Sequence, residues 1–199
     1  MTPFIVVEGL DGAGTTTQVD RLVAKLRAHG REVMATREPT GRSVGRIIRR
    51  VLSGDPDFPS ARVLPWLFAA DRADHLDAMI EPALAAGVIV VSDRYYHSSL
   101  AYQSLVQPLA QVHALNATFR APDLTVFVRV PPEVALARIE ARGGDREIFE
   151  QLDQLKRIDE AYGRVITLLR GLGQHIVEID GTPDPDSVAR QILEAVEAL

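Results

Sequence analysis

Phe4-Ile-Val-Val-Glu-Gly-Leu-Asp-Gly-Ala-Gly-Thr-Thr-Thr-Gln18 is the stretch of sequence that decides the fold. Its first four residues, 4–7, form an apolar and mainly β-branched run, which is typical of a buried parallel strand. The tight backbone turns that follow are permitted by three glycines, Gly9, Gly12 and Gly14. A helix is predicted to begin near Thr15 or Thr16. Because the first backbone N–H groups of a helix have no partner within it, the turn favours a phosphate-binding loop.

The loop matches the pattern G-x-x-x-x-G-K-[ST] from Gly9 to Thr16 with one departure, since Thr15 stands at the lysine position. In this pattern the lysine reaches the β- and γ-phosphates as a point charge, whereas a threonine hydroxyl donates a hydrogen bond without charge. Thr16 still offers the hydroxyl expected at Mg²⁺. The loop alone leaves two interpretations equally open, a nucleotide site and a glycine-rich turn without a ligand.

Composition narrows the classes of function. The 199 residues, 46% of them hydrophobic, predict a single domain, 1–199, with a sizeable core. A net charge of -5 argues against broad binding to a nucleic acid polymer or an anionic membrane, so any anion site must be a local basic cluster. The absence of cysteine excludes thiol catalysis and thiolate metal sites. With no targeting signal and no apolar run of membrane-spanning length, a cytoplasmic location is expected.

Strand-like and helix-like segments alternate along the chain. Further strands are predicted for four apolar runs, 32–36, 88–92, 124–130 and 175–179. Helical spacing predicts helices at 44–53, 61–86, 98–105, 109–119, from Pro132 onward, at 149–172 and at 185–198, with an interruption by Pro82 in the second of these. The alternation predicts an α/β fold of three layers, with helices flanking a mostly parallel sheet of five strands.

Charged side chains follow two of the predicted strands. Arg37 and Glu38 follow one, and Asp93 and Arg94 follow another. In a doubly wound sheet, ligands bind outside the carboxyl ends of the strands. Asp93 could help to place Mg²⁺, and Arg94 could neutralise charge on a transferring phosphoryl group. The alternatives are a structural Asp–Arg pair and, for Arg37 and Glu38, a solvated loop pair.

Phe68 and Arg72 stand four residues apart, so on a helix they share a face. An aromatic ring can stack on a base while a guanidinium binds phosphate. On spacing alone the better interpretation is a core phenylalanine beside an arginine that is paired with Asp71 or another acid.

A local basic cluster follows the fourth predicted strand. Arg138, Arg142 and Arg146 surround Gly143-Gly144. Because glycine lets the chain bend, the segment at about 138–150 is predicted to form a lid that closes over phosphates and excludes water. A helix end with solvated charges is the alternative.

Taken together, these segments resemble the thymidylate kinases, a family of P-loop nucleoside monophosphate kinases. The motifs that carry the resemblance are Glu8-Gly-Leu-Asp-Gly-Ala-Gly with Thr16-Thr17-Gln18, Thr36-Arg-Glu-Pro39, Leu67-Phe-Ala-Ala-Asp-Arg-Ala73, Ser92-Asp-Arg-Tyr95 with Ser98-Ser-Leu-Ala-Tyr-Gln103, and Pro122-Asp-Leu-Thr125. They span almost the whole chain. The resemblance implies a P-loop kinase fold, transfer of the γ-phosphoryl group of ATP to dTMP with Mg²⁺ to give dTDP and ADP, and a homodimer.

The resemblance also implies roles for individual residues. The ATP site would comprise the loop and one lid residue: Gly9, Leu10, Asp11, Gly12, Ala13, Gly14, Thr15, Thr16, Thr17 and, over adenine, Arg138. Phe68 would stack on thymine, Arg72 would hold the acceptor phosphate, and Arg94 would contact that phosphate or the transferring group. The rest of the dTMP site would be Asp11 at the 3′-hydroxyl, Arg37 and Leu52 at the base, and Ser99, Tyr102 and Gln103 around the nucleoside, with Tyr102 excluding a ribose 2′-hydroxyl. Thr16 and Asp93 would hold the metal, and the catalytic residues would be Asp93, Arg94, Arg142 and Arg146.

Three residues depart from the family's pattern. Thr15 replaces the catalytic lysine, Thr40 stands where glycine is usual, and Arg129 replaces an acidic residue. Loss of one cationic donor costs roughly 3 to 4 kcal/mol of transition-state stabilisation if nothing substitutes. We expect Arg142 or Arg146 to supply the missing charge. Two other functions stay open, a nucleotide-binding homologue impaired in catalysis and a kinase of another deoxynucleoside monophosphate.

Overall fold

The computed structural model describes residues 2–55, 57, 60–142 and 148–199. Five strands form one sheet in the order β2-β3-β1-β4-β5, and every neighbouring pair is parallel. The strands are β1 (Phe4–Gly9), β2 (Val33–Arg37), β3 (Ile89–Asp93), β4 (Leu124–Arg129) and β5 (Ile176–Asp180). The predicted α/β fold is confirmed, and its sheet is wholly parallel among the described residues.

Burial along each strand follows its place in the sheet. The central strands β1 and β3 are buried at every residue, which explains their continuous apolar runs. The edge strands β2 and β5 are only partly buried, with one and two buried residues respectively, because one flank of each lacks a neighbouring strand. The sequence therefore distinguishes centre from edge.

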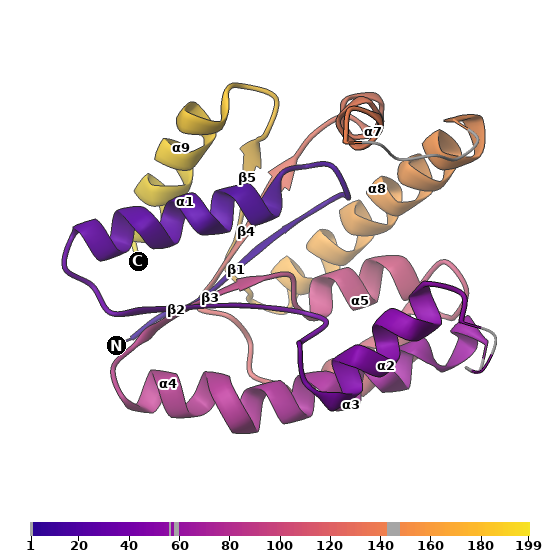
Figure 1. Ribbon diagram of the computed structural model, residues 1–199, viewed down its shortest axis with the longest axis horizontal. Helices are drawn as coiled ribbons and strands as arrows, with labels where there is room; N and C mark the ends of the chain where they lie inside the picture. The colour runs from indigo at the N-terminus through magenta and orange to yellow at the C-terminus, as the bar shows by residue number, and fades with distance from the viewer. Residues whose placement is uncertain (1, 56, 58–59, 143–147) are drawn as a thin grey trace.

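Helices cover both faces of the sheet (Figure 1). On one face lie α1 (Thr15–Ala28) and α9 (Pro185–Glu197), side by side. The other face carries α3 (Leu64–His75), α4 (Glu81–Ala85), α5 (Tyr96–Gln103) and α8 (Ile148–Gly171). The remaining α-helices of the described chain are α2 (Ser43–Leu52), which packs on α3, α6 (Leu109–Asn116) and α7 (Pro132–Glu140). This arrangement gives the three predicted layers.

The long helical pattern at 61–86 is divided in the structure. A 3-10 turn, Ala61–Val63, leads into α3, and a π-helical turn, Leu76–Ile80, separates α3 from α4. Pro82 has no N–H to donate to the carbonyl of Ala78, which explains why regular helix is interrupted ahead of it. Within the described residues, no helix combines the length and the apolar character that a membrane span requires.

Candidate active site

The predicted site residues meet at the carboxyl edge of the sheet. The phosphate loop follows β1, and Asp93 ends β3 beside it, since Val7 pairs with Asp93 in the sheet register. Arg37 ends β2 at the register position opposite Asp93. A cavity of about 180 Å³ opens here, lined by Leu10, Asp11, Gly12, Gly14, Thr15, Thr16, Thr17, Arg94 and Arg142. The phosphate loop, Arg94 just after the end of β3 and Arg142, which follows α7, therefore border the same cavity.

The loop backbone has the shape of an anion site. Gly14 precedes α1 in the left-handed region, at φ 91°, and no side chain caps the helix or places an acid in its first turn. The free N–H groups at this helix start therefore stay available to a ligand. Gly12 also has positive φ, and a Cβ there would lie 2.3 Å from the Ala135 carbonyl oxygen. Only glycine fits at this position.

Thr16 and Asp93 form the pair predicted to hold Mg²⁺. The Thr16 hydroxyl donates to Asp93 Oδ2 over 2.5 Å, and Asp93 Oδ1 is buried without a hydrogen-bond partner. An unpartnered carboxylate oxygen beside a hydroxyl fits a hard cation that takes one or two protein oxygens and shares the rest of its shell with phosphates and water. The residues present therefore fit Mg²⁺.

Arg94 has an uncommon backbone conformation. Its φ is +71°, and it is the one non-glycine residue of the described chain with positive φ. Two hydrogen bonds hold this backbone, from Arg94 N to the Val7 carbonyl over 3.0 Å and from the Ser92 hydroxyl to the Arg94 carbonyl over 2.7 Å. The conformation costs about 1 to 3 kcal/mol, and such strain concentrates at functional sites. It directs the side chain to the cavity, where Nη2 meets Asp11 Oδ1 at 2.8 Å.

Glu8 lies beside the site, and sequence reasoning assigned it no role although it opens the first motif of the resemblance. Its carboxylate is fully buried one residue before the loop, and it accepts from the Tyr95 and Ser98 backbone N–H groups and from the hydroxyls of Ser98 and Tyr162, over 2.7 to 3.2 Å. Burial raises the pKa of Glu8, and these donors oppose the rise. An acid within a buried apolar strand is the sequence signal that could have identified it.

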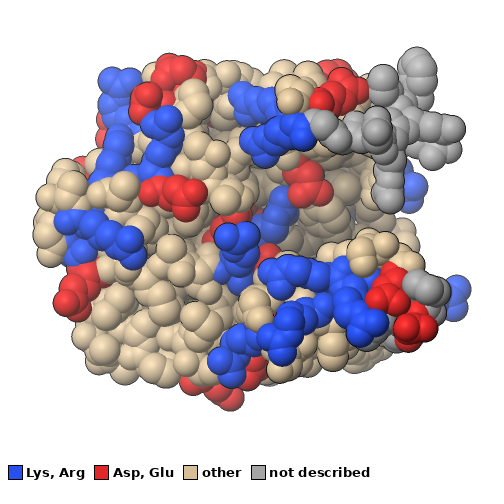
Figure 2. Space-filling model, in the orientation of Figure 1, with Lys and Arg blue, Asp and Glu red and all other residues tan. Residues whose placement is uncertain are grey.

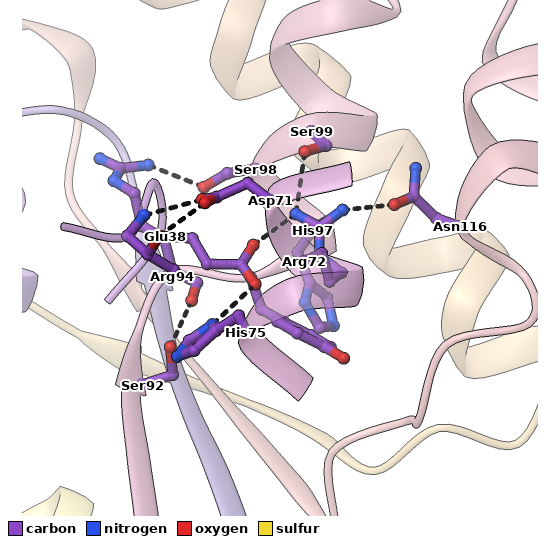
Figure 3. Close-up of polar contacts among 12 residues, drawn as sticks. Glu38, Asp71, Arg72, His75, Ser92, Arg94, His97, Ser98, Ser99 and Asn116 are labelled. Carbon is purple, nitrogen blue, oxygen red and sulfur yellow. Dashed lines mark hydrogen bonds and ion pairs between the residues drawn. The ribbon is translucent and has the colours of Figure 1, made fainter. Parts of the chain in front are cut away.

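Arg72 is buried and paired with protein groups. Its side chain is 0% exposed, and its guanidinium donates to Asn116, to Glu38 Oε2 over 2.5 Å and to the Ser99 hydroxyl over 3.1 Å (Figure 3). It also lies 5.0 Å from the centre of the Tyr95 ring. The structure therefore shows the paired arginine, with Glu38 as the acid, while Arg72 Nε is buried without a hydrogen-bond partner. Its contact with the acceptor phosphate stays a prediction.

Asp71, the acid first considered for Arg72, has another partner. Its two oxygens accept from the Thr40 N–H over 2.7 Å and from the Thr40 hydroxyl over 2.6 Å. Thr40, the second departure from the family's pattern, is thereby anchored to α3. Glu38 in turn contacts His75 Nδ1 at 3.2 Å, and His75 Nε2 lies 2.6 Å from the Thr36 hydroxyl. This buried network holds the chain after β2, and no sequence pattern predicts it.

The predicted nucleoside residues lie on α5. Ser99 and Gln103 are buried, and Tyr102 lies with its ring centre 5.7 Å from the Arg94 guanidinium carbon. Tyr102 Oη and Gln103 Oε1 are buried without hydrogen-bond partners. Buried polar atoms are ordinarily paired, so two unpaired oxygens on one helix indicate a place for a polar ligand.

The residues predicted at the base lie on three elements. Phe68 is half-buried on α3, Leu52 is 57% exposed at the end of α2, and Arg37 is exposed at the end of β2. Because α2 and α3 pack together, the first two are carried by neighbouring helices. Their contacts with thymine stay predictions.

Two of the three lid arginines are described. Arg138 donates to the carbonyls of Ala13, over 3.4 Å, and Gly181, over 2.9 Å, and so joins α7 to the phosphate loop. Arg142 is exposed and lines the cavity. Arg146 and the rest of 143–147 lie outside the described residues. Arg129, the third departure, pairs with Asp159 at 3.0 Å and Glu178 at 2.6 Å, away from the loop cavity.

Known proteins are similar to the chain over nearly its whole length. The family model for thymidylate kinase matches residues 7–192. A thymidylate kinase of Ruegeria pomeroyi is 43% identical over 97% of this chain and 93% of its own, and one of Synechococcus sp. is 40% identical over 98% and 94%. A probable thymidylate kinase of Pyrobaculum aerophilum is 37% identical over 98% and 96%. A match of this extent, on a chain whose loop, strand ends and arginines converge on one cavity, leads to one conclusion: the chain belongs to the thymidylate kinase family.

Proposed function

We propose that the chain transfers the γ-phosphoryl group of ATP to dTMP and releases dTDP and ADP. Membership of the thymidylate kinase family supports this reaction. The observation that carries it in the structure is the cavity where the phosphate loop, Arg94 and Arg142 meet. Phosphoryl transfer needs positioning and charge stabilisation more than covalent chemistry from the protein, and these groups supply both.

The loop binds the donor. Backbone N–H groups at the start of α1 face the cavity and bind phosphate oxygens, and the helix dipole adds attraction. Arg138, held between Ala13 and Gly181, borders the loop on the side where the resemblance implies adenine.

Thr16 and Asp93 would hold Mg²⁺, whose charge would neutralise phosphate oxygens when it is bound with ATP. Asp93 Oδ1 has no protein partner to lose when it turns to a ligand. The Thr16 hydroxyl already contacts the same carboxylate, so the two residues are held together before any ligand binds.

The acceptor lies toward α5. Arg94 contacts the dTMP phosphate, and Tyr102 and Gln103 use their unpaired oxygens for the nucleoside. The bulk of the Tyr102 ring opposes a ribose 2′-hydroxyl, while Asp11 addresses the 3′-hydroxyl. Phe68 stacks on the base. Arg72 supports this pocket from within, because it binds Ser99.

Arg142 replaces the missing lysine. Thr15 is 6% exposed and uncharged, and Arg142 lines the same cavity, where its guanidinium can meet the β- and γ-phosphates. A homologue that binds nucleotides without catalysis is not favoured, because Asp93, Arg94 and Arg142 all lie at the loop. The homodimer and the cytoplasmic location stay predictions.

The test is a coupled assay of ADP formation with ATP, Mg²⁺ and dTMP. We expect turnover by the parent chain and its loss in Asp93→Ala. Asp123→Ala is the matched control, because Asp123 accepts a hydrogen bond from Phe4 N over 2.7 Å at the opposite end of β1. It should lower stability and leave turnover per folded molecule unchanged.

Substrate choice is measured in the same assay. A pocket built for thymine should prefer dTMP to dUMP, dCMP and dGMP. No turnover by the parent with any of these acceptors, together with turnover by Thr15→Lys, would mean that the chain binds nucleotides but has lost the chemistry.

A further inference from the structure

Tyr162 places a phenolic hydroxyl from α8 against the carboxyl end of β1. The side chain is 0% exposed and contacts the carboxylate of Glu8, which lies 154 positions away in the sequence. Its hydroxyl is 3.0 Å from Glu8 Oε2, 2.9 Å from the Ser98 hydroxyl and 3.2 Å from Arg94 Nη1. The ring alone would be enough to fill the core. The hydroxyl that joins an acid to the cavity arginine therefore needs another explanation.

The directions of these hydrogen bonds form an ordered relay. Arg94 Nη1 donates to the hydroxyls of Tyr162 and of Ser98, the latter over 2.9 Å. Both hydroxyls are within donating distance of Glu8 Oε2, at 3.0 and 2.7 Å, and they also contact each other over 2.9 Å. When Glu8 is ionised it only accepts, and a hydroxyl that donates to it presents its lone pairs to Arg94.

The two ends of the Arg94 guanidinium differ. Nη1 is anchored by two hydroxyls that are themselves fixed by a buried acid; Figure 3 shows Arg94 directed at Ser98. Nη2 pairs with Asp11, whose side chain is 59% exposed, and so faces the cavity with a partner that an incoming anion can displace. One end is thus structural and the other is open to ligand.

We propose that Tyr162 is a positioning residue which, together with Glu8, fixes the Arg94 guanidinium for the phosphate of dTMP. The inference rests on the proposed role of Arg94. Tyr162 touches no reacting atom and acts through Arg94. A preorganised arginine loses less entropy when it binds phosphate, so the hydroxyl strengthens binding of the phosphate and not of the nucleoside.

Tyr162→Phe isolates the hydroxyl. The ring packs on Phe127, with 4.9 Å between centres, and edge-on to Tyr102 at 6.1 Å, and phenylalanine keeps both contacts. Tyr95→Phe is the matched control. Tyr95 is also buried, and its hydroxyl makes one hydrogen bond, to the Arg120 carbonyl over 3.1 Å, outside the relay.

Equilibrium binding of dTMP and of thymidine, which lacks the phosphate, provides the test. Tyr162→Phe should raise the dissociation constant of dTMP about tenfold, the effect of one hydrogen bond to a charged group, and change that of thymidine less than about twofold. In the Arg94→Ala background it should weaken dTMP binding less than about twofold, because its target is gone. Tyr95→Phe should change neither ligand's affinity.

Each other outcome overturns the inference. Equal weakening of dTMP and thymidine would show a general distortion of the pocket, and an equal effect in both backgrounds would show that Tyr162 acts independently of Arg94. If Arg94→Ala weakens dTMP binding and Tyr162→Phe does not, only the positioning role fails. If Arg94→Ala itself has no effect, the phosphate role proposed for Arg94 fails as well. Should Tyr162→Phe not fold, Ser98→Ala removes the other hydroxyl of the relay and must give the same pattern.

Discussion

Thr15 leaves the phosphate loop without a cation of its own, and Arg142 faces the loop across one cavity. We predict that Arg142→Ala lowers kcat about a hundredfold, since a charge directed at the transferring group is removed. The double variant Thr15→Lys with Arg142→Ala should recover most of that loss, because the lysine restores charge at the same phosphates. Steady-state kinetics with ATP and dTMP measure both.

Arg164→Ala is the control for this pair. Arg164 is exposed on α8, away from the loop cavity, so its removal should leave kcat at the parent value. Turnover near that of the parent in Arg142→Ala would end the idea that Arg142 replaces the lysine.

The buried pair of Arg72 and Glu38 yields a prediction for stability. Glu38→Gln leaves the fully buried guanidinium without its counter-charge, and we expect the free energy of unfolding to fall by about 3 kcal/mol. Glu133→Gln removes the same charge from a pair with Lys156 in which both side chains are about half exposed, and should leave stability near the parent value. Urea denaturation measures both; equal effects would contradict the prediction.

His97 predicts a dependence of stability on pH. Burial lowers the pKa of His97 to about 3, and nearby Arg72 adds to the effect. The unfolded chain therefore binds a proton below about pH 6.5 that the folded chain does not, so this contribution to stability is complete above pH 6.5 and declines toward pH 3. The loss reaches about 1.4 kcal/mol per pH unit.

His97→Gln should remove this decline. Its unfolding free energy, followed from about pH 7 to about pH 4.5, should change less steeply than that of the parent. Glu8, 3.8 Å from His97 Nδ1, titrates with the opposite sign because its pKa is raised, but it is present in both proteins. Parallel curves for the two proteins would refute the assignment.

Sequence reasoning succeeded where a rule of geometry joins distant residues. Thr16 and Asp93 are 77 positions apart, yet both follow strands of a parallel sheet, so their meeting at its carboxyl edge was predictable. No such rule predicts the contacts of Tyr162 with Glu8 or of Glu38 with His75. Those contacts depend on how each helix is rotated and how far its side chains reach. The partners of Arg72 within the protein could not be deduced for the same reason.

Among the elements, the position of α2 depends on Gly45, which has no side chain. A Cβ at Gly45 would lie 2.0 Å from the Thr40 carbonyl oxygen, so Gly45→Ala must push α2 away from the loop that Asp71 anchors. We expect a loss of about 1 to 3 kcal/mol. Gly163 on α8 has open space around it, and Gly163→Ala should stabilise by about 0.5 to 1 kcal/mol. Opposite shifts in thermal midpoint confirm this pair of predictions, and shifts of the same sign contradict it.

Element order and type followed from periodicity, and the boundaries followed from local chemistry. Asp184 caps α9 as the Asp-Pro pair predicts, accepting from the Asp186 and Ser187 N–H groups. The break in 61–86 was predicted at Pro82, but its form, a π-helical turn, depends on how the helix packs on the sheet and could not be deduced from spacing.

For the whole molecule, two features of the surface stand out: where basic side chains gather and where large apolar side chains are exposed. The net charge is -5, yet Figure 2 shows basic side chains gathered over the part of the surface that α2 occupies in Figure 1, where Arg46, Arg49 and Arg50 are exposed. Large apolar side chains also reach solvent, among them Trp66, 56% exposed, and Val106, 73% exposed. Such surface is consistent with the dimer that the resemblance implies.

Light scattering, which measures the molar mass in solution, tests whether the chain forms a dimer. We predict a mass twice that of the 21.8 kDa chain at micromolar concentration. If the exposed apolar surface forms the dimer interface, a charge placed there, as in Val106→Glu, should reduce the measured mass to that of a single chain. A single-chain mass for the parent would contradict the dimer.

The strand order also constrains how the chain is made and folded. β1 is synthesised first but lies at the centre of the sheet, and both of its neighbours, β3 and β4, come more than 80 residues later. Until residue 94 has emerged, β1 has no partner strand and the phosphate loop lacks Arg94, whose N–H binds the Val7 carbonyl. Because pairings this distant close slowly, a nascent or truncated chain that ends before β4 exposes an open, apolar strand edge, where aggregation competes with folding.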